Sequence, residues 1–268
     1  TVFQHTARPS NINSNWTALT HPQLDGNPNA RILVTQILID TAANTYNNRE
    51  IGVFYNGANK WAIFNENMDA MPNGASFNIL ILNNDNSILH TAVSGNIQGS
   101  TTKIDLPVLN NNPNAIIYVT QTWNGGGAPG VFNTQKVSTY YNGTQWTIYN
   151  EDNSTNMVEN SKYNVYFGAS SFVHKADATN SYPNLTYFDN PLINRDANAF
   201  IFALHNWNPF GAGTSVYNKK LGVFYTGSVW SIFDQDATPV SEGVYFNVAI
   251  APKTDSAFLH TTTASNII

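Results

Sequence analysis

Short apolar runs alternate with Asn-, Thr- and Gly-rich stretches along the whole chain, and no window keeps the 3.6-residue apolar period of an amphipathic helix. The clearest runs come in pairs joined by a short Gly-containing turn, which is typical of β-hairpins. These pairs are 51–57 with 60–65, 137–143 with 145–150, and 221–227 with 229–234. Because β-branched and aromatic residues dominate the runs, the pattern predicts an all-β protein.

The same motifs return along the chain at a constant distance. Four histidines in similar surroundings, His5, His90, His174 and His260, are spaced by 85, 84 and 86 residues. A proline stands 17 residues after each of the first three, at Pro22, Pro107 and Pro191. The repeat predicts three β units, 1–86, 87–170 and 171–252, followed by a partial fourth copy, 253–268, as a C-terminal capping strand.

Each unit is expected to be a small antiparallel β-sandwich or barrel, with strands that neighbouring units could share. Four His-motif strands serve three bodies, so in a closed ring the first and last copies would compete for one place. We therefore expect an open tandem array, in which the strand that begins one unit completes the sheet of the unit before it. A single body with pseudo-threefold symmetry is the alternative.

The order of the motifs carries a resemblance. His-Thr-Ala, Asn-Pro-Asn-Ala, Val-Thr-Gln, Gly-Val-Phe-Tyr-Asn-Gly and Trp-Ala-Ile-Phe-Asn follow one another in the first two units, with small changes. This order resembles tandem repeats of about 85 residues found in secreted bacterial proteins of uncharacterised function, over nearly the whole chain. The resemblance implies secretion and a repeat architecture but no activity. The third unit departs from it at Asp196 and Thr226.

Composition narrows the classes of partner. Charged residues make up 11% of the chain, the formal net charge is −5, and the 12 Lys and Arg residues form no basic run. Nucleic acid is therefore not expected as a partner. No apolar stretch approaches the roughly 18 residues of a membrane-spanning helix. Cysteine is absent, which excludes disulfides and thiolate chemistry. A Cys-free extracellular protein suits a bacterial source better than a eukaryotic one. The first residue, Thr1, is typical of a processed chain, although a boundary chosen within a longer sequence explains it equally well.

Two residue types recur at one position in every unit. No motif histidine has a partner histidine at a fixed spacing, so we expect a ring that bonds a neighbouring backbone carbonyl rather than a metal ligand. The tryptophans of the hairpins, Trp61, Trp146 and Trp230, are expected to anchor the cores.

A Trp-Asn pair on a Gly-rich loop is the candidate ligand site. Trp123 and Asn124 occur in unit 2 and Trp207 and Asn208 in unit 3, whereas residues 37–41 of unit 1 contain neither Trp nor Gly. An aromatic face beside an amide suits a sugar ring, which is apolar on one face and rimmed by hydroxyls, and loops on a rigid scaffold often carry function. The alternative is that each Trp folds back to cover a sheet edge or a junction between units.

Acidic and amide residues follow each hairpin tryptophan. Asp152, Asp234 and Asp236 are candidate Ca²⁺ ligands, although the full EF-hand pattern is missing and turn chemistry explains the composition equally well. No catalytic residue is assigned: Glu66 and Glu151 are replaced by Gln235 in unit 3, and no hydrolase or nucleotide-binding motif occurs.

These observations predict a secreted, non-catalytic, multivalent binding or adhesion protein. Its expected ligand is a glycan or a cell-surface polysaccharide, bound in a lectin-like manner without a required cofactor. One alternative is a structural protein that self-associates end to end by donating the surplus strand. A second alternative is a glycan-active hydrolase.

Overall fold

The computed structural model describes residues 1–39, 45–168, 170–211 and 213–251, and the predicted all-β class is confirmed. Each unit contributes seven strands in the same order. In unit 1 they are β1 (Val2–Thr6), β2 (Ile12–Asn13), β3 (Trp16–Ala18), β4 (Ile32–Leu38), β5 (Ile51–Tyr55), β6 (Trp61–Asn65) and β7 (Ser76–Ile81). In unit 2 they are β8 (Ser87–Thr91), β9 (Ile97–Gln98), β10 (Thr101–Lys103), β11 (Tyr118–Thr122), β12 (Val137–Tyr141), β13 (Trp146–Asn150) and β14 (Lys162–Tyr166). In unit 3 they are β15 (Ser171–Lys175), β16 (Ser181–Tyr182), β17 (Leu185–Phe188), β18 (Phe200–His205), β19 (Leu221–Tyr225), β20 (Trp230–Asp234) and β21 (Tyr245–Ala251).

Helical structure in the described residues is limited to three single 3₁₀ turns. They are η1 (Asn84–Asn86), η2 (Gly125–Gly127) and η3 (Pro209–Gly211). Within the part of the chain that the structure describes, no helix is long and apolar enough to cross a membrane.

The seven strands of a unit form two antiparallel groups. In unit 1 the strand order is β1-β7-β4 in the three-stranded group and β2-β3-β6-β5 in the four-stranded group. Units 2 and 3 repeat this division, as β8-β14-β11 with β9-β10-β13-β12 and as β15-β21-β18 with β16-β17-β20-β19. The predicted hairpins are β5–β6, β12–β13 and β19–β20, in equivalent registers.

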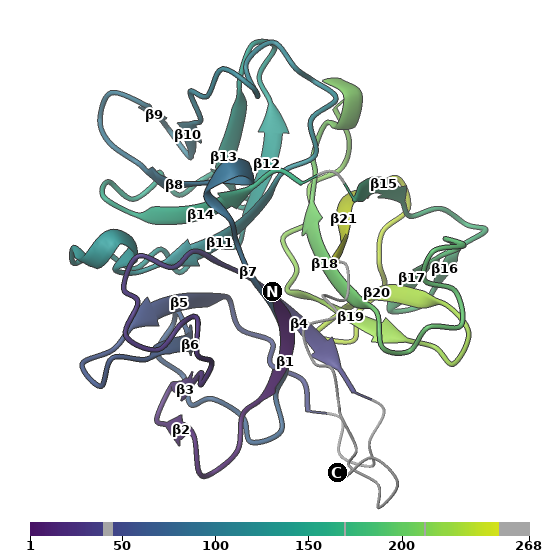
Figure 1. Cartoon of the computed structure of the whole chain (residues 1–268). Helices are drawn as coiled ribbons and strands as arrows, with labels where there is room; N and C mark the ends of the chain where they lie inside the picture. Colours follow the sequence, from purple (N-terminus) through teal and green to yellow (C-terminus); the bar gives the residue numbers. More distant parts are fainter. Residues whose placement is uncertain (40–44, 169, 212, 252–268) are drawn as a thin grey trace, which may run out of the picture.

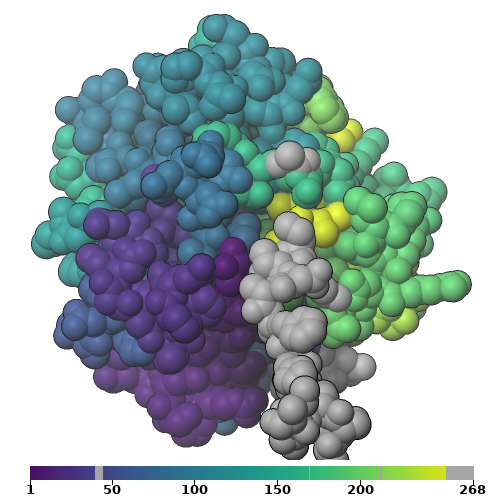
Figure 2. All heavy atoms as spheres, in the orientation of Figure 1, coloured from purple at the N-terminus to yellow at the C-terminus, as the bar shows by residue number. Residues whose placement is uncertain are grey.

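Parallel pairing joins the three-stranded group of one unit to the four-stranded group of another. Strand β4 of unit 1 pairs with β19 of unit 3, and β11 of unit 2 pairs with β5 of unit 1. A parallel bridge between Thr139 and Asn206 joins unit 2 to unit 3 at the equivalent place. Every unit therefore contacts both others, and three lobes surround a common centre (Figure 1). The space-filling view shows the first and second units abutting as one body (Figure 2).

Our preference for an open tandem array was wrong, and the pseudo-threefold alternative holds. The physical reason is that the units are joined by pairing between β4 and β19, between β11 and β5, and between Thr139 and Asn206. The ring therefore closes without a fourth His-motif strand. The fourth histidine, His260, and the proposed capping strand 253–268 lie outside the described residues.

Three buried asparagines cross-link the units near the ring's centre. The Nδ2 atoms of Asn78, Asn164 and Asn247 donate to the carbonyl oxygens of Ile201, Ile32 and Ile117, at 3.0, 3.1 and 2.9 Å. Each of these asparagine side chains is fully buried. Each bond runs from one unit to another, and together the three bonds go once around the ring.

Apolar side chains of the three units also meet in one cluster. Leu33, Tyr118 and Phe202 occupy equivalent positions on β4, β11 and β18 and share one core cluster. Units 1 and 3 have further clusters of their own. The hairpin tryptophans are the predicted core anchors: Trp61, Trp146 and Trp230 are at most 1% exposed. Their indole nitrogens donate to the carbonyls of Asn27, Asn112 and Asp196, at 2.8, 3.0 and 2.9 Å.

Each motif histidine belongs to a hydrogen-bonded chain of three side chains. In unit 2, His90 Nε2 lies 2.8 Å from Thr102 Oγ1, and this hydroxyl donates to Asn96 Oδ1 at 2.8 Å. The same chain joins His5, Thr17 and Asn11 in unit 1 and His174, Thr186 and Asn180 in unit 3. The ring thus bonds a threonine hydroxyl, not the backbone carbonyl that we expected. The histidines are structural and tie the first strand to the four-stranded group.

Acid should weaken the fold through these histidines. Burial lowers the pKa of His5, His90 and His174 from 6.5 to about 4. Between these values the unfolded chain binds more protons than the native protein. The free energy of unfolding should therefore fall as the pH drops from 6.5 to 4, by on the order of 1–3 kcal/mol per histidine.

Three carboxyl groups oppose this trend: burial raises the pKa of Glu50 and Glu66, and it raises that of Asp234 to about 6, so each stabilises the fold as the pH falls through its raised pKa. Urea unfolding at pH 7, 5.5 and 4 measures the balance. Replacing one histidine, as in His90→Gln, should make the pH dependence shallower. An identical pH dependence of stability in His90→Gln and in the wild-type protein would contradict the prediction.

Candidate ligand-binding pockets at the unit junctions

The loop tryptophans follow directly on the strands that join the units. Trp123 comes after β11, and its backbone nitrogen donates to Val53 O of unit 1 at 2.9 Å. Trp207 follows β18 by two residues, and its nitrogen donates to Thr139 O of unit 2 at 3.1 Å. Both bonds extend the parallel pairing between units, so each indole is fixed at a junction rather than on a free loop.

The asparagines next to them bind the neighbouring unit. Asn124 Oδ1 accepts from Tyr55 N and Asn124 Nδ2 donates to Tyr55 O, both at 2.7 Å. Asn208 repeats this clamp on Tyr141, at 2.6 and 2.5 Å. Both polar ends of each amide are therefore committed to the backbone of the adjacent hairpin. Asn124 and Asn208 thus have a structural role, and their role in ligand binding stays a prediction.

Trp123 lines a pocket of about 220 Å³ between units 1 and 2. Its lining residues are Asn15, Trp16, Phe54, Phe64, Met68, Trp123 and Phe132. The aromatic rings form a continuous wall, with edge-on contacts from Trp16 to Phe54 and from Phe54 to Phe64, both at 5.6 Å between centroids. The pocket is almost entirely apolar.

Trp207 lines the equivalent pocket, of about 260 Å³, between units 2 and 3. Its lining residues are Thr101, Tyr140, Tyr149, Asn153 and Trp207. Tyr140 meets Trp207 edge-on at 5.9 Å and Tyr149 edge-on at 5.5 Å. The structure therefore places both predicted tryptophans in junction pockets, each opposite an aromatic wall supplied by the preceding unit.

The junction between units 3 and 1 has smaller side chains at these places. Leu38 on β4 takes the position of the tryptophan, and Leu185 and Ala237 take those of Trp16 and Met68. Tyr46 packs edge-on against Phe233 at 5.7 Å, as Phe132 does against Phe64. The part of the unit 1 loop between residues 40 and 44 lies outside the described residues.

A family model described as a domain of unknown function (DUF7452) matches residues 1–81, 56–167 and 153–250. The chain belongs to this family. The three matches confirm the predicted tandem repeat. No curated protein and no solved structure matches the chain significantly.

Buried polar groups behind the Trp207 pocket hold units 2 and 3 together. Glu151 accepts from Ser138 Oγ within unit 2 and from the Nδ1 atom of His205 in unit 3. Burial alone would raise the pKa of Glu151, but the bond and charge of His205 lower it to about 2. His205 and Glu151 are wholly inaccessible to solvent, so this pair serves the junction rather than a ligand.

A small polar cavity of about 60 Å³ lies where all three units meet. Glu50, Lys136 and Lys220 line it from equivalent positions. Burial raises the pKa of Glu50, which the two lysines oppose, and burial together with Glu50 raises the pKa of Glu66. A water occupies about 30 Å³ of liquid volume, so the cavity has room for a few atoms but not for a sugar ring.

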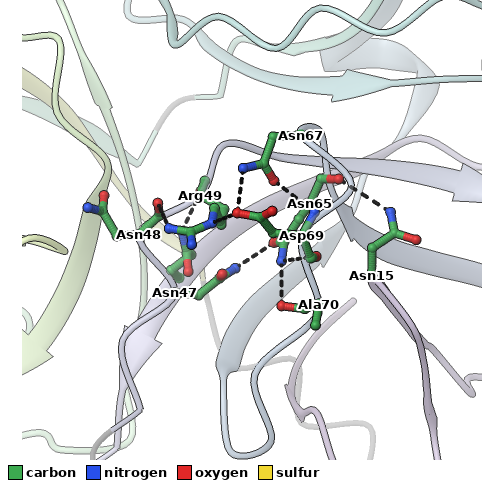
Figure 3. Close-up of polar contacts among 9 residues, drawn as sticks. Asn15, Asn47, Asn48, Arg49, Asn65, Asn67, Asp69 and Ala70 are labelled. Atoms are coloured by element: carbon green, nitrogen blue, oxygen red, sulfur yellow. Dashed lines mark hydrogen bonds and ion pairs between the residues drawn. The ribbon is translucent and has the colours of Figure 1, made fainter.

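The acidic stretches after β6, β13 and β20 are tight turns. In unit 1, Asn65 Nδ2 donates to the carbonyls of Asp69 and Ala70, and Arg49 pairs with Asp69 (Figure 3). The amide group thus occupies the centre of the turn, where a cation would otherwise gather the carbonyls.

Two of the candidate Ca²⁺ ligands, Asp234 and Asp236, accept from the same Thr238 hydroxyl, whereas Asp152 lies in another unit. Asp152 accepts from Thr155 and Ser154, and Asp236 from Lys219 and Thr238. Asp234 is buried. Across the described ranges, no three His, Asp or Glu side chains are grouped as a metal site requires.

Sequence reasoning missed the walls of the pockets. Phe54 and Tyr140 belong to the predicted hairpins, in the alternation that points away from the core tryptophan. Aromatic residues on the face of a hairpin that points away from its own core indicate that another part of the protein packs on that face. The sequence alone does not say which unit this is, because that depends on how the three units are arranged.

The asparagine clamps should contribute to stability. Asn208→Ala leaves the backbone N–H and C=O of Tyr141 without partners, so we expect a loss of about 1–3 kcal/mol in the free energy of unfolding. Asn124→Ala should behave alike. Chemical denaturation measures both, with Asn114→Ala, an exposed position, as the matched control. If Asn208→Ala and Asn114→Ala unfold at the same denaturant concentration, the clamp contributes nothing.

Proposed function

We propose that this protein is an extracellular, non-catalytic binding or adhesion protein that recognises carbohydrate through the Trp123 and Trp207 pockets. The observation that carries the proposal is the recurrence of one arrangement at two junctions. In each, a tryptophan from one unit faces aromatic side chains of another across a pocket open to the surface.

The chemistry of these pockets supports a sugar ligand. A pyranose ring has an apolar face that packs on aromatic rings, and a few well-placed polar groups then fix its orientation. Small-molecule sites in proteins are mostly apolar concavities of this kind, often between structural units. The pockets therefore suit a ligand the size of one or two sugar rings.

Two pockets on one body also give repetition a purpose. Linked binding sites can raise overall avidity by about 10²–10⁴ without new contacts, provided that both engage the same target. A cell-surface polysaccharide presents many copies of one residue and is a target of this kind.

The hydrolase alternative has less support. A glycan hydrolase is expected to have a pair of carboxyl groups in a cleft, with the pKa of at least one of them raised. Glu50, Glu66 and Asp234 have raised pKa values, but Glu66 and Asp234 are buried and Glu50 lines the small central cavity. None of the three lines the Trp123 or the Trp207 pocket.

A glycan array tests the proposal. Wild-type protein should bind a subset of glycans, and the double variant Trp123→Ala with Trp207→Ala should lose that binding, because it removes the aromatic face from both pockets. Tyr182→Ala, which removes an aromatic side chain that is 71% exposed and outside both pockets, is the matched control. The array should be run with Ca²⁺ and with a chelator.

Retained binding in the double variant would reject the pocket assignment. Wild-type protein that binds no glycan under either condition would reject the carbohydrate proposal itself. Circular dichroism of each variant shows whether the fold is kept, and the indoles tested are not the core tryptophans.

A further inference from the structure

The two pockets occupy equivalent places but differ in chemistry. Position by position, Trp16 corresponds to Thr101, Phe54 to Tyr140, and Met68 to Asn153. Each exchange replaces an apolar group of the Trp123 pocket by a polar or hydroxyl-bearing group in the Trp207 pocket.

In the Trp123 pocket one face of the indole is covered. Phe132 stacks on Trp123 with 6.0 Å between centroids and 24° between planes. Asn15, the polar residue of this pocket, already donates to Asn65 O and to the Met68 sulfur. A sugar here would find apolar surface but few groups for its hydroxyls.

In the Trp207 pocket the aromatic neighbour of the indole, Tyr140, stands edge-on to it. Tyr140 stands at 88° to Trp207, and no aromatic ring stacks on this tryptophan within the described ranges. The residue equivalent to Phe132 is Val216, which is 51% exposed. Gly213 packs closely against the indole, since a Cβ there would lie 2.9 Å from Trp207 Cη2.

Polar groups at the mouth of the Trp207 pocket are free for a ligand. In the described part of the chain, the Tyr140 hydroxyl and the Asn153 amide make no hydrogen bond, whereas the Tyr149 hydroxyl is bound to Glu151 at 2.9 Å. A hydroxyl and an amide beside an aromatic face are a donor and acceptor set for the rim of a pyranose ring.

We propose that the Trp207 pocket is the principal sugar site and that Tyr140 and Asn153 determine its specificity. This inference rests on the proposed function and deepens it. The Trp123 pocket binds the same sugar about tenfold more weakly or worse, because two hydrogen bonds to the ligand are missing there. Each chain then has one strong and one weak sugar site, and the weak site still adds avidity when both engage the same target.

Exchanging residues between the pockets tests the inference. The probes are methyl glycosides of glucose, galactose and mannose, titrated calorimetrically. The double variant Tyr140→Phe with Asn153→Met gives the Trp207 pocket the side chains of the Trp123 pocket and should weaken binding about tenfold or more. Met68 already adopts the left-handed backbone conformation of Asn153, so the fold should tolerate this change.

The reverse exchange, Phe54→Tyr with Met68→Asn, should strengthen binding in a Trp207→Ala background, where only the Trp123 pocket is intact. The single variants Trp123→Ala and Trp207→Ala provide the reference affinities. Equal affinity in these two single variants, or unchanged binding after Tyr140→Phe with Asn153→Met, overturns the inference and leaves the proposed function standing. A wild-type protein that binds no glycoside and no array glycan contradicts both.

Discussion

Everything in this protein depends on the bonds that run from each unit to another around a common centre. A buried asparagine of each three-stranded group donates to a backbone carbonyl of another unit, and the parallel strand pairs place the partners within reach. A buried amide or carbonyl without a partner is costly, so a unit removed from the ring would have to expose or leave unpaired groups that are satisfied now. The three repeats therefore pack as one body, and we expect them to unfold together.

The ring explains why the candidate site lies at the junctions. Extending β11 and β18 beyond the parallel pairing brings a tryptophan and then an asparagine onto the adjacent hairpin. The two residues of the Trp-Asn pair have different roles. The asparagine clamps the neighbouring backbone, and this clamp holds the tryptophan opposite the aromatic wall of a different unit. A pocket made in this way belongs to neither unit alone, which is why single repeats would not be expected to bind ligand.

The all-β class, the three hairpins and the core tryptophans were predictable, since each depends on a pattern within one unit. The arrangement of the units was not. The surplus histidine strand suggested an open array because periodicity reports how many units exist but not which strands meet between them. The histidine partners were missed for a similar reason: Thr102 and Asn96 join His90 only through the fold, although their spacing recurs in all three units. The pocket walls, with Phe54 and Tyr140, needed the neighbouring unit to be placed first.

The free energies of unfolding of Asn78→Ala, Asn164→Ala and Asn247→Ala test the closed ring most directly. Asn78 links unit 1 to unit 3, Asn164 links unit 2 to unit 1, and Asn247 links unit 3 to unit 2. The ring predicts similar losses for all three, of about 1–3 kcal/mol each, because each variant leaves a buried carbonyl unpaired. An open array has no junction between units 1 and 3. A negligible loss for Asn78→Ala, beside clear losses for the other two variants, would contradict the ring.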